Sequence, residues 1–130
     1  FATRWGAQFG GINSFNQDLI SAFAAVCFHN VKTICVVLDA SIEDQQIALN
    51  EQVYLVSLDL PDQSTFQLGF EDLVWNKLQS CGHQFDCDHA VWLGHDRITG
   101  AIAIGASRTR GGRSALIHHM SYSRYESFAE

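Results

Sequence analysis

Prolines, basic residues and long apolar runs are all scarce in this chain. Pro61 is the single proline among 130 residues, and there is no low-complexity or Ser/Gly-rich stretch that would mark a linker. Eight Lys and Arg stand against 14 Asp and Glu, and the resulting net charge of -6 argues against general nucleic-acid binding. No apolar run reaches the roughly 20 residues needed to cross a bilayer. We therefore expect one globular domain over residues 1–130, without a membrane span.

Targeting and disulfide signals are missing as well. No basic-then-apolar signal segment opens the chain. The first residue is Phe1 and not Met, and Phe1-Ala-Thr resembles the second half of a strand, so we expect the chain to be part of a longer protein. The cysteines have no disulfide-framework spacing, which predicts free thiols in a reducing compartment and a cytoplasmic location. They are Cys27, Cys35, Cys81 and Cys87.

What the chain does have is a regular alternation of strand and helix patterns. Apolar residues make up 47% and charged residues 17%, a globular profile. Strands are expected at 33–38, 53–60, 89–94 and 114–120, with Pro61 closing the second of them. Helices are expected from about 15 to 28, 41 to 52, 70 to 78 and 98 to 107, with a loop at 108–113.

Two of these helices have readable local signals. In the first, Phe15, Leu19, Phe23 and Val26 recur at helical spacing, which predicts an apolar stripe facing the core, with Ser14 as the N-cap. In the second, Ser41-Ile-Glu-Asp has the pattern of a capping box with Asp in place of Glu.

Alternating strands and helices predict a parallel sheet covered by helices on both faces, a three-layer α/β fold. In such sheets, ligands bind outside the carboxyl ends of the strands. With the common strand order 3-2-1-4-5, three segments share one edge of the sheet. These segments are the loop at Gly10-Gly11, the strand end at Gly94-His95-Asp96, and the pair His118-His119.

The glycine-containing loop precedes the first helix and suits a bound anion. Gly6, Gly10 and Gly11 allow positive φ and close approach of a ligand to the backbone. The helix that follows presents free N–H groups and a partial positive charge at its first turn. The spacing is G-x-x-x-G-G and not the dinucleotide pattern G-x-G-x-x-G.

Histidines at strand ends are the candidates for chemistry. His95 can donate or accept a hydrogen bond near neutral pH and can contact a hydroxyl-rich ligand, and Asp96 can orient it or cap the next helix. His118 and His119 alternate faces if they lie in a strand, so we expect at most one of them to reach the site.

Two alternative sites remain open at this point. Two Cys and two His occur as C-x-H-x-x-x-C-x-H, namely Cys81, His83, Cys87 and His89. That spacing differs from the standard zinc patterns, and we assign no metal. Asp39, at the end of the 33–38 strand, lies where dinucleotide folds place an acid on the ribose hydroxyls, but it follows Gly11 by more than the usual ~20 residues.

Three stretches resemble GT-B glycosyltransferases of family 4, of the glycogen-synthase and sucrose-synthase kind. Phe-Gly-Gly-Ile-Asn-Ser-Phe-Asn, residues 9–16, is similar to their first loop and helix. Trp-Leu-Gly-His-Asp-Arg-Ile-Thr-Gly, residues 92–100, is similar to their His-Asp stretch. Ser-Ala-Leu-Ile-His-His-Met-Ser-Tyr, residues 114–122, is similar to their strand ending in His-Asn, with His118 in the His place.

The resemblance implies the N-terminal Rossmann-like domain of a two-domain enzyme that transfers a sugar from a nucleotide-sugar donor to a hydroxyl acceptor. It implies that Gly10 and Gly11 approach the donor diphosphate or the transferred sugar. It also implies that His95 is the catalytic residue, in contact with the sugar or acceptor near the anomeric carbon, that Asp96 binds substrate, and that His118 shapes the acceptor side. No cofactor is implied. Glycogen synthases place Lys-Thr before the Gly pair, whereas Gln-Phe stands here, so a lysine contact to the donor is not expected from this loop. Alone, the domain is expected to bind weakly and to be inactive.

Two other functions are compatible with the residues. One is a non-catalytic α/β ligand-binding or sensor module, which the absence of a second Rossmann-like domain in the parent protein would favour. The other is a dinucleotide-binding oxidoreductase domain, which would depend on Asp39.

Overall fold

A computed structural model describes residues 1–27, 29–59 and 70–119. It contains four α-helices, four strands and two short 3-10 helices in these ranges. In chain order they are η1 (Ala7–Phe9), α1 (Gly11–Cys27), β1 (Thr33–Leu38), α2 (Ile42–Asn50), β2 (Val53–Leu58), α3 (Glu71–Ser80), η3 (Cys87–His89), β3 (Val91–His95), α4 (Asp96–Arg110) and β4 (Arg113–Ile117). None of the described helices has both the length and the apolar character to cross a membrane.

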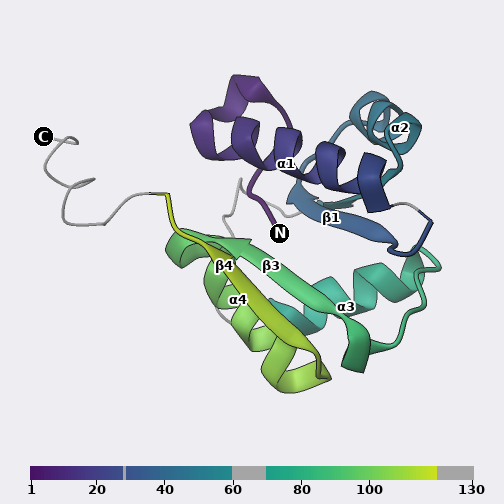
Figure 1. The fold of residues 1–130 in the computed structure, drawn as a ribbon, viewed down its shortest axis with the longest axis vertical. Coiled ribbons are helices and arrows are strands. Elements are labelled where there is room, and N and C mark those ends of the chain that lie inside the picture. Colours follow the sequence, from purple (N-terminus) through teal and green to yellow (C-terminus); the bar gives the residue numbers. More distant parts are fainter. Residues whose placement is uncertain (28, 60–69, 120–130) are drawn as a thin grey trace, which may run out of the picture.

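The strands form two parallel pairs. β1 pairs with β2 from Thr33 opposite Val53, and β3 pairs with β4 from Val91 opposite Arg113. The predicted parallel pairing is therefore present, as two two-stranded sheets. In Figure 1, α1 and α2 lie on one side of β1, and α3 and α4 on the other.

The first residues of the chain run between the two pairs of strands (Figure 1). The Ala2 backbone N–H donates to the Val36 carbonyl at 3.1 Å, and the Leu38 N–H donates to the Thr3 carbonyl at 3.0 Å. On the other side, the Phe1 nitrogen donates to the Leu93 carbonyl at 2.7 Å. This segment thus links β1 to β3 and fixes the distance between the two pairs.

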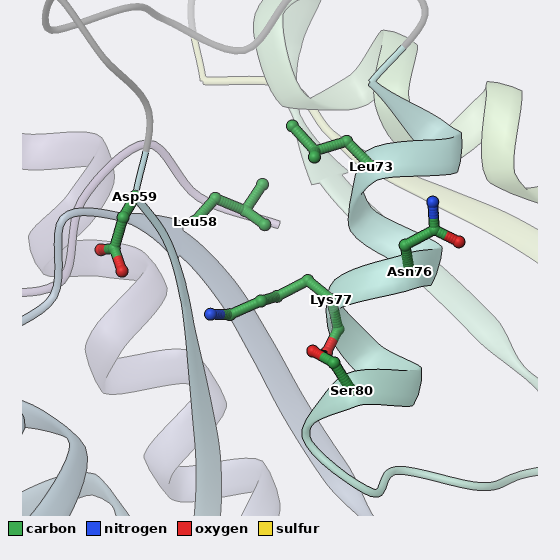
Figure 2. A pocket seen from close by; sticks show the side chains of 6 residues that line it. All are labelled: Leu58, Asp59, Leu73, Asn76, Lys77 and Ser80. Atoms are coloured by element: carbon green, nitrogen blue, oxygen red, sulfur yellow. The ribbon is translucent and has the colours of Figure 1, made fainter.

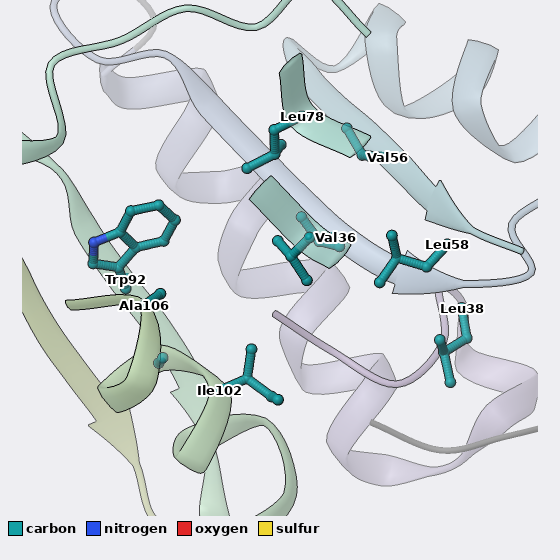
Figure 3. Close-up of a cluster of buried hydrophobic side chains, with 10 residues drawn as sticks. Val36, Leu38, Val56, Leu58, Leu78, Trp92, Ile102 and Ala106 are labelled. Atoms are coloured by element: carbon teal, nitrogen blue, oxygen red, sulfur yellow. The ribbon is translucent and has the colours of Figure 1, made fainter. Parts of the chain in front are cut away.

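The core forms two clusters, one on each side of β1. Its odd-numbered residues Cys35 and Val37 pack with Ala24 of α1 and Ala48 of α2. The even-numbered residues belong to the second cluster, which joins β2, α3, β3 and α4 (Figure 3). Its members are Val36, Leu38, Val56, Leu58, Val74, Leu78, Trp92, Ile102, Ala103 and Ala106. A strand buried on both faces explains the continuous apolar run from Thr33 to Leu38.

The predicted loop at 108–113 is wrong. α4 continues to Arg110, and β4 begins at Arg113. The last turn of α4 is held because Arg110 Nη2 lies 2.7 Å from Asp72 Oδ1 and its guanidinium lies over the ring of Trp75 at 4.9 Å. Gly111, with φ of 96°, ends the helix. The predictions for Pro61 and for residues 120–130 lie outside the described residues.

The predicted orientation of α1 is also wrong. The helix begins at Gly11, not after Ser14. Phe15, Phe23 and Val26 are 45%, 44% and 82% exposed, so most of the expected apolar stripe faces outward. The buried residues of α1 are Asn13, Asn16 and Ala24. Polar contacts made by the two asparagines, described below, set the rotation of this helix in place of its apolar periodicity.

The N-cap at Ser41, the serine half of the predicted capping box, is confirmed and gives a testable stability effect. The Ser41 hydroxyl accepts from the Asp44 N–H at 3.0 Å. We expect Ser41→Ala to lower the free energy of unfolding by about 1 kcal/mol, because an N–H of the first turn loses its partner. Urea unfolding followed by circular dichroism measures the change. Ser80→Ala, at an exposed hydroxyl near the end of α3, is the control, with an expected change within about 0.5 kcal/mol. Equal effects of the two substitutions would contradict the prediction.

Candidate functional site

The turn from β3 into α4 places His95 and Asp96 at the carboxyl end of the strand. His95 is the last residue of β3, and Asp96 opens α4 with φ of 47°. The His95 backbone N–H donates to Thr99 Oγ1 at 2.8 Å, and this hydroxyl donates to the His95 carbonyl at 3.2 Å. The turn passes so close to α4 that a Cβ added at Gly94 would lie 2.7 Å from Gly100 Cα. Only glycine fits at this point.

The His95 imidazole is the centre of a buried chain of polar side chains. His95 is 3% exposed. Its Nε2 lies 2.7 Å from Asn16 Oδ1, and its Nδ1 lies 2.9 Å from His119 Nε2. The rings of His95 and His119 stack at 5.1 Å. Asn16 is 1% exposed and donates from Nδ2 to Cys35 Sγ at 3.6 Å.

Asp96 holds the segment that follows β4. Its Oδ1 accepts the backbone N–H of His119 at 2.9 Å and lies 3.1 Å from His118 Nδ1. Both histidines therefore reach the site, contrary to the prediction that at most one would. The reason is that β4 ends at Ile117, so the alternation of a strand does not apply to the two residues after it. His118 contacts Asp96, and His119 contacts His95.

Asn13 stabilises the loop that precedes α1 through three hydrogen bonds. Its Oδ1 accepts from Thr3 Oγ1 and from the Arg4 backbone N–H, both at 3.1 Å, and its Nδ2 donates to the Phe9 carbonyl at 3.0 Å. Gly10 has φ of 104°, the left-handed region that favours glycine. A Cβ added at Gly10 or Gly11 would meet nothing within 4 Å. The backbone here is fixed on one side and open on the other, which leaves room for a ligand.

The environment keeps His95 neutral. The pKa of His95 is lowered to about 4, mainly by burial, with the neighbouring His119 acting in the same direction and Asp96 opposing it. At neutral pH the ring therefore has one N–H donor and one nitrogen acceptor. A neutral imidazole with a fixed tautomer can position a hydrogen-bonding partner, but it adds no charge to the site.

Two of the three predicted segments, the end of β3 and the residues after β4, meet directly, and α1 reaches them through Phe15 and Asn16 and not through Gly10 and Gly11. Phe15 of α1 lies with its ring edge-on to His119 at 4.9 Å and to His95 at 6.4 Å. Gly10 and Gly11 precede Asn16 by less than two helical turns, and Asn16 is the residue of α1 that contacts His95. Phe15 and Asn16 of α1, the end of β3 and the residues after β4 therefore form one cluster.

The alternative sites do not assemble in this way. Within residues 1–27, 29–59 and 70–119, no three His, Cys, Asp or Glu side chains are grouped to hold a metal ion, so Cys81, His83, Cys87 and His89 do not form a site together. Asp39 lies 2.7 Å from Arg4 Nη1 in an ion pair. An acid engaged by arginine is less available to ribose hydroxyls.

A hollow of about 320 Å³ lies elsewhere, between the end of β2 and α3 (Figure 2). It is lined by Leu58, Asp59, Leu73, Asn76, Lys77 and Ser80. Lys77 extends across it toward Asp59 in Figure 2. None of the predicted site residues lines this hollow.

Sequence reasoning missed Asn16 and expected at most one of His118 and His119 to reach the site. One signal was available for Asn16. Asn13 and Asn16 are three residues apart and thus share a face of α1, and two asparagines on one helix face indicate polar contacts on that face. The role of His119 had no such signal, because it depends on where β4 ends.

The arrangement defines a class of protein: an α/β domain with parallel strands and a cluster of polar residues at their carboxyl ends. A family model described as "Family 4 Glycosyltransferase in conflict systems" matches residues 1–130, and the chain belongs to this family of glycosyltransferases. No curated protein and no solved structure matches the chain in the same comparisons. The family agrees with the resemblance to family 4 glycosyltransferases noted in the sequence.

Proposed function

We propose that this chain is the acceptor-side, N-terminal domain of a GT-B glycosyltransferase that transfers a sugar from a nucleotide-sugar donor to a hydroxyl acceptor. The observation that carries the proposal is the meeting of the start of α1 with His95 and His119 at the carboxyl end of β3. A ligand at this edge would have the helix N-terminus and the imidazoles around it.

In this proposal, the two strand pairs and residues 1–3 belong to one Rossmann-like, three-layer unit of spatial order 3-2-1-4-5. Support comes from the hydrogen bonds that residues 1–3 make to β1 on one side and to Leu93 on the other. The two core clusters on opposite sides of β1 are those expected when helices cover both faces of a sheet.

The residues have distinct roles in the proposed site. Gly10 and Gly11 let the donor phosphates or the transferred sugar approach the backbone, where the first turn of α1 supplies N–H groups. His95 and Asp96 form the sugar side, and His118 borders the acceptor side. The donor nucleotide is held mostly by a second Rossmann-like domain of the parent protein, so residues 1–130 alone bind weakly and do not turn over.

All four cysteines are free, which agrees with a reducing compartment, and we propose a cytoplasmic location. Neither a sensor module nor an oxidoreductase domain is favoured, because the family is one of glycosyltransferases and Asp39 is paired with Arg4.

Isothermal titration of the full-length protein with UDP, ADP and their sugars tests this function. We expect heat of binding with one nucleotide and its sugar, and at least a tenfold weaker dissociation constant for His95→Ala, which is about 1.4 kcal/mol. His83→Gln, whose ring packs against Tyr54 of β2 and not against the candidate site, is the control and should bind as the wild type does. Thermal unfolding of each variant shows whether it is folded. No heat with any of these ligands would contradict the proposal.

A further inference from the structure

Both ring nitrogens of His95 are engaged inside the protein. Asn16 occupies Nε2 at 2.7 Å, and His119 occupies Nδ1 at 2.9 Å. With 3% of its surface exposed, His95 has no free nitrogen to offer a substrate. The residue at the outer end of this chain of hydrogen bonds is His119, which is half-buried.

The hydrogen bonds along the chain have a defined direction. Asn16 turns its carbonyl oxygen toward His95 and its amide nitrogen toward Cys35. A carbonyl oxygen only accepts, so Nε2 of His95 carries the hydrogen. Because burial keeps His95 neutral, its Nδ1 is an acceptor, and Nε2 of His119 must donate to it.

The reverse direction, in which the donor and the acceptor of each hydrogen bond are exchanged, would give weaker hydrogen bonds. It would require the Cys35 thiol, a weak donor, to donate to the Asn16 carbonyl. It would also replace an imidazole N–H donating to an amide oxygen, for which 2.7 Å is a short and favourable distance, by an amide N–H donating to a ring nitrogen. The observed direction therefore uses the stronger donor and acceptor.

Three contacts hold the imidazole of His119 in place and leave Nδ1 as its remaining ring nitrogen. The ring is held at Nε2 by His95, its backbone N–H is held by Asp96, and the ring of Phe15 packs edge-on against it. Within the described part of the chain, Nδ1 of His119 has no hydrogen-bond partner. In a neutral ring whose hydrogen is on Nε2, this nitrogen is a lone-pair acceptor.

We propose that Asn16 and His95 are positioning residues that hold His119 in the Nε2–H tautomer, so that His119 Nδ1 is the group that accepts a hydrogen bond from a substrate hydroxyl. The second half of this inference depends on the proposed function, because a hydroxyl-rich ligand is what a sugar-transfer site binds. The first half concerns the protein without ligand. Within the proposed site, the direct contact thus belongs to His119, and His95 acts through it.

The chemistry of Asp96 agrees with this role. Its carboxylate is hydrogen-bonded to the backbone of His119 and is close to His118. A negative charge beside the imidazole favours any partial positive charge that develops on it when it accepts a hydrogen bond. Asp96 thereby supports His119 as an acceptor and does not compete for its ring nitrogens.

Nitrogen-15 NMR of the imidazole rings in the full-length protein, labelled at histidine, tests the first half of the proposal. Long-range proton–nitrogen correlations at pH 7.5 distinguish the two tautomers, and His95→Gln and His119→Gln assign the signals. We expect His95 and His119 both to carry their hydrogen on Nε2. Finding either ring predominantly as the Nδ1–H tautomer, or His95 as an imidazolium, would overturn the proposal.

Two substitutions at one position separate positioning from packing. Asn16→Asp keeps an acceptor, so Nε2 of His95 should keep its hydrogen, while the added carboxylate raises the pKa of this ring. Asn16→Leu removes the acceptor and should raise the Nδ1–H population of both rings. Unchanged signals in a folded Asn16→Leu variant would overturn the positioning role. If this variant does not fold, the tautomers observed in the wild type still decide whether the positioning role is correct.

Addition of the nucleotide sugar found by calorimetry tests the second half. We expect the His119 Nδ1 signal to shift more than either nitrogen of His95, and His119→Gln to weaken binding about tenfold while His83→Gln binds as the wild type does. A bound ligand that leaves His119 Nδ1 unshifted would overturn the contact. If no ligand binds, the proposed function has failed, and the tautomers in the free protein still decide the positioning role.

Discussion

Gly94→Ala is expected to lower the free energy of unfolding by about 3 kcal/mol or more and the melting temperature by roughly 10 °C. A Cβ at this position would lie 2.6 Å from the Thr99 carbonyl carbon and 2.7 Å from Gly100 Cα. Both are backbone atoms of α4, so no side chain can rotate away, and the start of the helix must move. Because His95 and Asp96 lie at this start, ligand binding should be lost together with stability.

Gly100→Ala is the matched control for this prediction. Gly100 lies one turn into the same helix, and a Cβ there would meet only Leu116 Cδ2, at 3.3 Å. That methyl group can shift, and Ala has the higher helix propensity by about 1 kcal/mol. Thermal unfolding should thus show Gly100→Ala close to the wild type. If Gly94→Ala melts within about 2 °C of the wild type, the close approach of β3 and α4 is not as described.

Acidification should remove roughly 3 kcal/mol of stability through His95 alone. Its pKa is about 4 in the folded protein against an ordinary value of 6.5. A group with a lowered folded pKa binds more protons in the unfolded chain, so its contribution is complete above pH 6.5 and is lost as the pH falls toward 4. The cause is mainly burial, with His119 adding to it and Asp96 opposing it. Denaturant unfolding at a series of pH values measures the loss.

Two variants assign this acid loss to His95. His95→Gln removes the titrating ring and should flatten the dependence of stability on pH between 6.5 and 4, even if the variant is less stable overall. His118→Gln, which removes an exposed imidazole next to the site, should keep the dependence of the wild type. Burial and Lys32 also lower the pKa of His83, so some acid loss remains in His95→Gln. A steep dependence that is the same in His95→Gln would contradict the assignment.

Elements that depend on residues close together in the sequence were predictable from the sequence. β1 occupies the predicted residues Thr33–Leu38, because a continuous apolar run suits a strand buried on both faces. The cap at Ser41 depends on contacts within one turn and was predicted as well. The meeting of the α1, β3 and β4 ends followed from the rule that parallel strands have their carboxyl ends at one edge.

The predictions that were wrong concern features that depend on residues far away in the sequence. The rotation of α1 is set by Asn13, which binds the loop before the helix, and by Asn16, which binds a histidine 79 residues away. Apolar periodicity has no information about such contacts and so placed Phe15 and Phe23 inside. The extension of α4 to Arg110 likewise depends on Asp72 of α3.

The mapping of backbone amide shifts on the full-length protein as nucleotide sugar is added tests most directly whether the edge formed by α1, β3 and the residues after β4 is the ligand site. We predict that the large shifts will gather at residues 10–16, 94–96 and 117–119. Shifts that gather instead around Leu58 and Lys77, at the hollow between β2 and α3, or that leave all three predicted segments unchanged while ligand binds, would contradict the account.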